Sequence, residues 1–183
     1  MRLSLTVRQV ALAVALGAAA TIGGALVFEH AFGYVPCKLC LMQRDPYYAA
    51  IPLALAAALA PPRWGRAGLW LLALVFAVSA GLGAYHAGVE WGFWTGPADC
   101  GGGGAGAGAG NVGDFLNQLQ TTRVVSCTEA AWRFLGLSLA GWNVLISLVL
   151  MGLAIVAALG KSFSVGRKDP ARAKPYGSSS LSQ

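Results

Sequence analysis

Cysteine is the residue type that could do chemistry in this chain, and its four copies form two groups. Cys37 and Cys40 make a CxxC pair within VPCKLCLMQRDPYY, while Cys100 and Cys127 stand on either side of a glycine-rich stretch. A CxxC pair is typical of dithiol redox chemistry or of metal binding, depending on its context. The surroundings of the four cysteines therefore decide which chemistry is predicted.

Several features next to the CxxC pair favour a thiolate at one of its two sulfurs. Asp45 and Pro46 predict the start of a helix just after the pair, with Asp45 as the N-cap and Pro46 in the first turn. The free backbone N–H groups of a helix start carry partial positive charge, and Lys38 and Arg44 add full positive charges. Positive charge lowers the pKa of a nearby thiol.

Transmembrane helices are expected to position these residues. The chain has 183 residues, of which 56% are hydrophobic and 11% charged, with a mean hydropathy of +0.61, whereas about 25% of residues are charged in a typical soluble domain. The second of four apolar runs is short for a hydrocarbon core of about 30 Å, so residues 37–44 are expected to lie at the membrane boundary. We predict an all-α membrane protein, a bundle of four transmembrane helices within residues 1–160, from the runs 10–28, 46–60, 68–87 and 135–159.

Lysine and arginine predict the orientation of this bundle. Cytoplasmic N- and C-termini place nine of the 13 basic residues inside, in agreement with the positive-inside rule. The two periplasmic loops then span about 29–45 and 88–134, and a basic cytoplasmic tail, 161–183, is predicted to be disordered. Anionic lipid headgroups explain the net charge of +6, so no nucleic acid partner is needed. A cleaved signal peptide is the alternative for the first run, which is long for that role.

Both cysteine pairs lie in the predicted periplasmic loops. Disulfides form and persist outside the plasma membrane, so this placement favours redox chemistry over the packing role of a single buried cysteine. Residues 101–110 directly follow Cys100 and are predicted to be a flexible glycine-rich tether, with a tolerated insertion as the alternative. Residues 111–120 are predicted to form a short amphipathic helix on the membrane surface.

The membrane offers a thiolate pair an electron acceptor that a soluble CxxC protein lacks. A quinone dissolved in the bilayer can take two electrons from the pair at the interface. Arg44 suits the charge that develops on a quinone oxygen, since it is permanently cationic and has several donors; its alternative role is an anchor to lipid phosphate. A Cys100–Cys127 disulfide would enclose a long segment and be open to an attacking thiolate. These residues predict a relay from a partner dithiol protein, through both pairs, to a quinone.

Three segments of the chain resemble the bacterial disulfide bond formation protein B (DsbB) family. They are CKLCLMQRDPYY, YHAGVEWGFWTGP, which leads to Cys100, and CTEAAWRFLGLSLAGWN, and they cover about residues 28–143 in the family's order. The resemblance implies a four-span enzyme of the bacterial inner membrane with its site facing the periplasm. It also implies a DsbA-like partner of thioredoxin fold, ubiquinone or menaquinone as cofactor, and no metal.

The resemblance also implies a role for each cysteine. Cys37 and Cys40 would be the quinone-coupled pair, with Cys40 contacting the quinone as a thiolate. Cys100 would be attacked by the DsbA-like partner, and Cys127 would be its resolving mate. A disulfide between Cys37 and Cys127, joining the two loops, is expected during turnover.

Two further residues are implied to bind the quinone. Arg44 would support the Cys40 thiolate, and His86, near the outer end of the third span, resembles a family histidine close to the quinone. A structural hydrogen bond is the alternative role for His86. Glu90 either tunes His86 or is solvated, and Asn143 either bonds between helices or faces the quinone. Interhelical hydrogen bonds are expected from Ser138 and Ser147, and an interfacial aromatic belt from Trp91, Trp94 and Trp132.

Three other classes of protein are compatible with parts of this pattern. A quinone-linked relative of vitamin K epoxide reductase would carry its CxxC late in the chain, whereas here the motif is early. A structural zinc protein would use all four cysteines, but the glycine stretch between Cys100 and Cys127 makes a poor zinc spacing. A transporter subunit would show buried charges within its spans, which these apolar runs lack.

Overall fold

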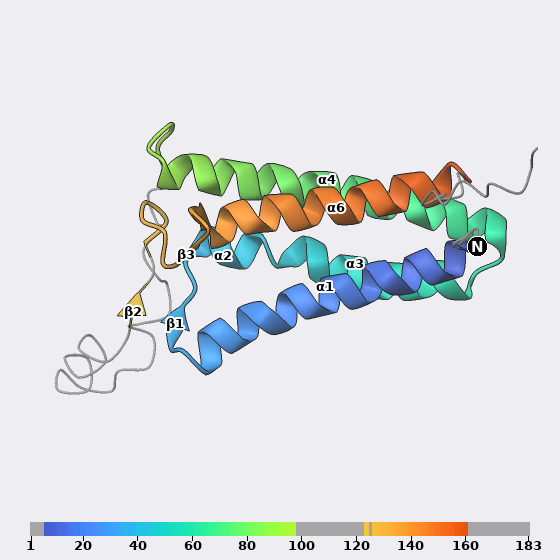
Figure 1. The fold of residues 1–183 in the computed structure, drawn as a ribbon, viewed down its shortest axis with the longest axis horizontal. Coiled ribbons are helices and arrows are strands. Elements are labelled where there is room, and N and C mark those ends of the chain that lie inside the picture. Colours follow the sequence, from blue (N-terminus) through green and yellow to red (C-terminus); the bar gives the residue numbers. More distant parts are fainter. Residues whose placement is uncertain (1–5, 98–122, 125, 161–183) are drawn as a thin grey trace, which may run out of the picture.

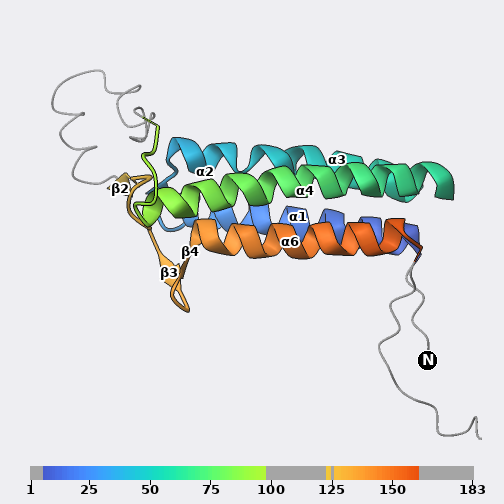
Figure 2. The ribbon, with the colours of Figure 1, turned by 90° about the horizontal axis from the view of Figure 1, so that it is seen from above.

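The computed structural model describes residues 6–97, 123–124 and 126–160 and shows a bundle of helices. Within these residues the helices are α1 (Val7–His30), α2 (Lys38–Met42), α3 (Asp45–Leu59), α4 (Pro62–Glu90) and α6 (Leu139–Ala158). Figures 1 and 2 show α1, α3, α4 and α6 side by side along one axis, with the short α2 leading into α3. The prediction of a mostly helical chain is confirmed.

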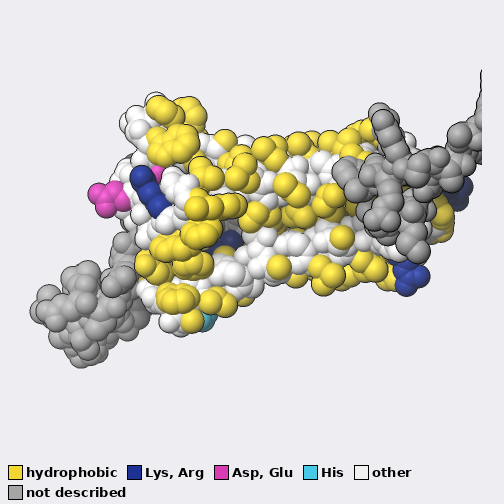
Figure 3. Space-filling view, viewed as in Figure 1, with side chains coloured by type: hydrophobic (Ala, Val, Ile, Leu, Met, Phe, Trp, Pro, Cys, Tyr) yellow, Lys and Arg dark blue, Asp and Glu magenta, His cyan; other side chains and the backbone are white. Residues whose placement is uncertain are grey.

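Three of the described helices, α1, α4 and α6, are long and apolar enough to cross a membrane. Hydrophobic side chains follow the length of the bundle, while charged side chains gather toward its ends (Figure 3). These features fit a membrane protein. α3 has 15 residues and contains Pro52, which makes it shorter than the other three helices. A fourth span and the predicted loop topology therefore stay predictions, and the predicted tail 161–183 lies outside the described residues.

Capping residues set where the long helices begin. Thr6 starts α1 with a capping box, because its hydroxyl accepts the Gln9 backbone N–H while the Gln9 side chain accepts the Thr6 N–H. Ser138 starts α6 in the same way, accepting the Gly141 N–H. Ser138 is thus an N-cap and not the interhelical bonder that was expected. These caps satisfy backbone groups that have no partner inside the helix.

Two predicted helix starts were wrong. Arg44, not Asp45, is the N-cap residue of α3, with φ −80° and ψ −30°, and it makes no side-chain cap bond because a guanidinium has no acceptor atom. The last apolar run begins at Leu139 instead of Leu135. Leu135 and Gly136 have φ of 52° and 82° and form the turn of a hairpin, in which β3 (Arg133–Phe134) pairs antiparallel with β4 (Leu137–Ser138).

Small residues let the helices approach closely and form the core. A Cβ placed on Gly68 of α4 would lie 2.7 Å from the Ala57 Cβ of α3. Larger side chains fill the middle of the bundle, where Tyr47 packs edge to face against Phe76. Packing through small residues is typical of helices in membranes. Lipid tails are as apolar as the side chains, so helix association depends on close van der Waals packing instead of the hydrophobic effect.

The cysteine pair lies at one end of this bundle. The chain begins and ends its described helices at the opposite end, near the α3–α4 connection (Figure 1). At the cysteine end, β1 (Tyr34–Val35) pairs in parallel with β2 (Arg123–Val124), with Tyr34 opposite Arg123. This pairing joins the loop before α2 to the loop before α6.

Candidate functional site

The CxxC pair is held by the short helix α2. Cys37 is the N-cap of α2, and its Sγ accepts the Cys40 backbone N–H at 3.2 Å. The two Sγ atoms are 2.7 Å apart, and both cysteines are free. From the sequence, the nearest helix start was predicted after the pair, at Asp45. In the structure a helix already starts at Cys37.

This geometry divides the charge of the reduced pair unequally. A side-chain hydrogen bond from Cys40, supported by hydrogen bonds from His86 and from the Cys40 backbone, lowers the pKa of Cys37 to about 5 against the opposing effect of burial. The hydrogen bond shared with Cys37, burial and the Cys37 charge raise the pKa of Cys40. In the reduced pair Cys37 is therefore the thiolate, whereas the family resemblance implied a thiolate at Cys40.

His86 connects the thiol pair to α4. Its side chain is buried, and its Nε2 lies 3.8 Å from Cys37 Sγ and 3.8 Å from Glu90 Oε1. Its Nδ1 is within hydrogen-bonding distance of Gln43 Nε2. His86 is thus a buried hydrogen-bonding residue that directly contacts the redox pair.

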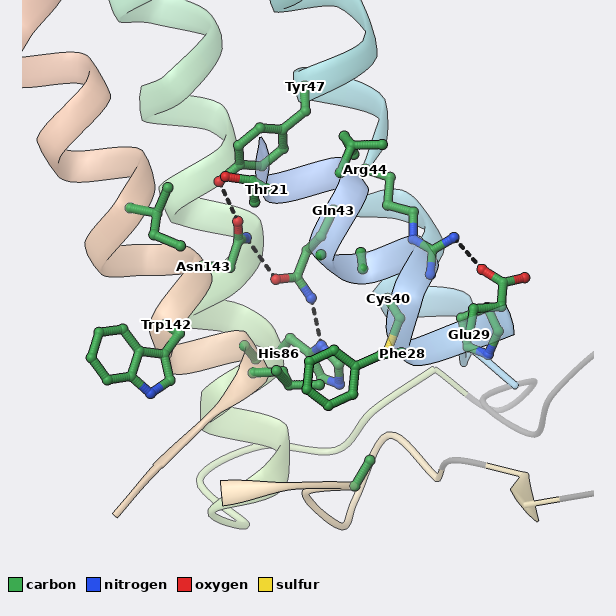
Figure 4. Close-up of a pocket in the computed structure, with 18 of the residues that line it drawn as sticks. Thr21, Phe28, Glu29, Cys40, Gln43, Arg44, Tyr47, His86, Trp142 and Asn143 are labelled. Atoms are coloured by element: carbon green, nitrogen blue, oxygen red, sulfur yellow. Dashed lines mark hydrogen bonds and ion pairs between the residues drawn. The ribbon is translucent and has the colours of Figure 1, made fainter. Parts of the chain in front are cut away.

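A chain of polar side chains runs from His86 into the bundle (Figure 4). Gln43 Oε1 accepts from Asn143 Nδ2 at 2.7 Å, and Asn143 Oδ1 accepts from the Tyr47 hydroxyl at 2.6 Å. The Tyr47 hydroxyl also lies 2.9 Å from Ser147 Oγ, which donates to Ser79 Oγ on α4. The interhelical hydrogen bonds expected of Asn143 and Ser147 are confirmed.

This chain fixes the tautomer of His86. Gln43 Oε1 is occupied by Asn143, and Gln43 Nε2 donates to the Leu39 carbonyl, so the Gln43 amide presents N–H to His86 Nδ1. Nδ1 is therefore the acceptor, and the proton of the neutral ring is on Nε2. That proton points toward Cys37 and Glu90.

A cavity of about 360 Å³ lies beside the pair, among α1, α3, α4 and α6. We call it the site cavity. Most of its wall is apolar, and its polar lining residues include two carboxylates, Glu29 and Glu90, together with Cys40, Gln43, Arg44, His86 and Asn143. An apolar cavity with a few convergent polar groups is the usual form of a small-molecule site.

Arg44 has a partner that the sequence did not predict. Its Nη1 forms an ion pair with Glu29 Oε2 of α1, and its side chain is 12% exposed. Both residues line the site cavity (Figure 4). The Arg44 charge therefore faces the cavity and is partly balanced within it.

Cys127 belongs to the same buried region as the CxxC pair. It is disulfide-bonded and has no exposed surface. Cys127 packs in one cluster with Cys37, Leu39 and Val89, against which Cys40 also packs; we call this the thiol cluster. Cys100, the tether 101–110 and the predicted helix 111–120 lie outside the described residues.

Among the described residues, one group has the composition of a metal site. The ligand atoms of Cys37, Cys40 and His86 all lie within 4.8 Å of one another. Two thiolates on one tetrahedral zinc, each about 2.3 Å from the metal, are separated by roughly 3.8 Å. The Sγ separation of 2.7 Å is much shorter, so this geometry suits a thiol pair better than a zinc site. The expectation of no metal stays a prediction.

Sequence reasoning missed two contributors to the site: Gln43 bridges His86 and Asn143, and Glu29 pairs with Arg44. For Glu90 the sequence left two roles open, and the structure places its side chain buried beside His86. The four-residue spacing of His86 and Glu90 indicates one helix face, and Gln43 is one turn from Cys40. The contact between Glu29 and Arg44 has no local signal, because it joins two helices.

Known proteins resemble this chain over most of its length. The family model described as Disulfide bond formation protein DsbB matches residues 7–157. A relative from Verminephrobacter eiseniae, named Disulfide bond formation protein B, is 32% identical over 171 residues, covering 89% of this chain and 92% of its own. A relative of the same name from Marinobacter nauticus is 33% identical over 151 residues, covering 78% and 88%.

One relative has a name that states no activity. The Uncharacterized protein RP370 of Rickettsia prowazekii is 28% identical over 127 residues, covering 69% of this chain and 73% of its own. No solved structure matches the chain.

Proposed function

This chain belongs to the DsbB family of disulfide bond formation proteins, and we propose that it is a membrane thiol–disulfide oxidoreductase coupled to a quinone. It reoxidises a periplasmic DsbA-like dithiol protein of thioredoxin fold at the periplasmic face of the bacterial inner membrane. Electrons pass from Cys100 and Cys127 to Cys37 and Cys40, and then to ubiquinone or menaquinone.

The position of Cys37 is the observation that carries this proposal. Its Sγ touches Cys40 Sγ, and the same residue packs with disulfide-bonded Cys127 in the thiol cluster. Thiol–disulfide exchange requires an attacking thiolate to reach a disulfide sulfur. In this proposal the partner opens the disulfide of Cys127, and the released Cys127 thiolate attacks a Cys37–Cys40 disulfide at Cys37, which forms the Cys37–Cys127 bond and releases Cys40 as a thiolate.

The thiolate was assigned to Cys37 from the geometry of the reduced pair and to Cys40 from the family resemblance. This exchange explains how each assignment applies at a different stage of the reaction. A Cys37–Cys127 disulfide removes both the hydrogen bond and the charge of Cys37 that raise the pKa of Cys40 in the reduced pair. The negative charge then rests on Cys40, which lines the site cavity. Cys37 is the thiolate of the fully reduced pair, and Cys40 is the thiolate of the interloop intermediate.

We expect the second part of the reaction, reduction of the quinone, to take place in the site cavity. A quinone accepts two electrons and two protons on becoming a quinol. Arg44 presents a permanent positive charge to the cavity, and Gln43, Asn143 and His86 are held in place by their hydrogen bonds to one another. Fixed donors and charges stabilise developing negative charge without reorganising. The apolar remainder of the wall suits a lipid-soluble ligand.

Quinone reduction by the purified protein tests the proposed function. The protein in detergent receives a reduced thioredoxin-like dithiol protein and a quinone, and quinone absorbance is followed. We expect stoichiometric quinone consumption in the wild type and none in Cys40→Ser or Cys40→Ala, with circular dichroism confirming that each variant is folded. Consumption that continues unchanged in both folded variants would contradict the electron path.

A further inference from the structure

The reaction under Proposed function needs one more proton than the reduced cysteine pair supplies. The inference about the source of that proton rests on the proposed function. With Cys37 as thiolate and Cys40 as thiol, oxidation of the pair to a disulfide releases two electrons and one proton. Reduction of a quinone to a quinol takes up two electrons and two protons. One further proton must therefore enter the buried site in every turnover.

Glu90, the last residue of α4, has an unusual environment. Its side chain is 5% exposed, and its Oε1 lies 3.8 Å from the Nε2 of His86. Its other oxygen, Oε2, is buried and has no hydrogen-bond partner among the described residues. A buried carboxylate oxygen without a hydrogen-bond partner is costly, so Oε2 is an acceptor that no described residue satisfies.

Glu90 also lies between two cavities. It lines the site cavity together with Cys40 and His86. It lines a second cavity at the loop end of the bundle, which we call the outer hollow, formed by residues 89–96 and Thr128. Among the described residues, Glu90 is the one side chain common to both walls.

We propose that the Glu90 carboxyl group carries protons from the outer hollow into the site cavity, with Oε2 as the proton-carrying atom. The carboxylate takes a proton from water in the outer hollow and becomes a carboxylic acid. It then gives that proton to an oxygen of the quinone that is being reduced in the site cavity, and returns to the carboxylate. The Nε2 of His86 lies 3.8 Å from Oε1, so Oε2 is the oxygen left for the transfer.

The other acidic side chain of the site cavity is less suited to this role. Glu29 lines the cavity but forms an ion pair with Arg44, and its side chain is 30% exposed. Among the described residues, Glu90 instead contacts His86, whose ring also faces the thiols of Cys37 and Cys40.

Three substitutions test the transfer. Glu90→Gln keeps the size of the side chain but cannot cycle a proton, so we expect kcat for quinone reduction to fall by about 10²-fold, the lower range for acid–base groups. Glu90→Asp keeps a carboxyl group and should stay within about tenfold of the wild type. Glu129→Gln, the same substitution at an exposed position near Cys127, should match the wild type. Equal rates for Glu90→Gln and Glu90→Asp would overturn the proposal.

Two measurements on quinone-free protein separate this proposal from the proposed function. In a single turnover, the oxidised enzyme should oxidise the partner dithiol equally fast with Glu90 or with Gln at this position, because no quinone proton is involved. The ¹⁵N spectrum of His86, one of two histidines in the chain, should change in Glu90→Gln; His30→Gln assigns the signals. An unchanged His86 signal would refute the contact. A wild type that reduces no quinone would refute the proposed function, whatever the His86 spectrum shows.

Discussion

The two cysteines of the CxxC motif are chemically different because they occupy different positions on one short helix. Cys37 is the N-cap and accepts hydrogen bonds from the Cys40 thiol and backbone, while Cys40 donates. The motif predicted that one sulfur would be a thiolate. Which one it is depends on donor geometry and on His86, 49 residues away in the sequence.

Thiolate absorbance in the ultraviolet tests this difference. The variant Cys100→Ser, Cys127→Ser retains the CxxC pair alone. After reduction it should show one thiolate between pH 6 and pH 8, and the signal should be lost as the pH falls through about 5, because protonation of Cys37 removes the charge. Adding Cys37→Ser should remove the signal in this range. A thiolate that appears only near the ordinary pKa of about 8.5 would contradict the assignment.

At the scale of the elements, close helix packing positions the polar chain of the site. α3 supplies Tyr47, and α6 supplies Asn143 and Ser147, and these groups hydrogen-bond across the two helices. Apolar runs predict that such helices exist. They do not predict which faces meet, since rotation about each helix axis depends on packing with its neighbours.

Substitution at a glycine of α4 measures this packing. Gly68→Ala places a Cβ 2.7 Å from the Ala57 Cβ of α3, whereas Gly81→Ala on the same helix meets nothing within 4 Å. Both variants gain the same helix propensity, so their difference isolates the clash. We expect Gly68→Ala to be less stable than Gly81→Ala by about 1–3 kcal/mol, measured by unfolding in detergent. Equal stability of the two variants would show that α3 and α4 do not approach each other at Gly68 as closely as the structure indicates.

At the scale of the whole molecule, the fold brings three loops to one end of the bundle. The segments before α2, after α4 and before α6 meet there, through the β1–β2 pairing and the thiol cluster. Cys37 and Cys127 are both fully buried in that cluster. This arrangement allows an exchange between two cysteines that are far apart in the sequence.

A trapped disulfide tests the arrangement of the loops. The variant Cys40→Ser, Cys100→Ser retains Cys37 and Cys127, and mild oxidation should join them within one chain. Peptide mapping by mass spectrometry under non-reducing conditions detects the bond. The matched variant Cys37→Ser, Cys100→Ser, which retains Cys40 and Cys127, should cross-link less, because Cys40 is only partly buried against the cluster. Free thiols or intermolecular dimers in the first variant would count against the predicted interloop intermediate.

The sequence by itself determined the helical membrane class, the position of the CxxC pair and the family, because hydropathy, a CxxC spacing and family motifs are local properties of the chain. The predicted starts of two helices were wrong by a few residues, because caps and a hairpin turn decide those boundaries. The tertiary structure decided which sulfur carries the charge, that Glu29 pairs with Arg44, and that Glu90 lies between two cavities. Each of these depends on distances between side chains from different helices and loops, and such distances are set only when the helices pack.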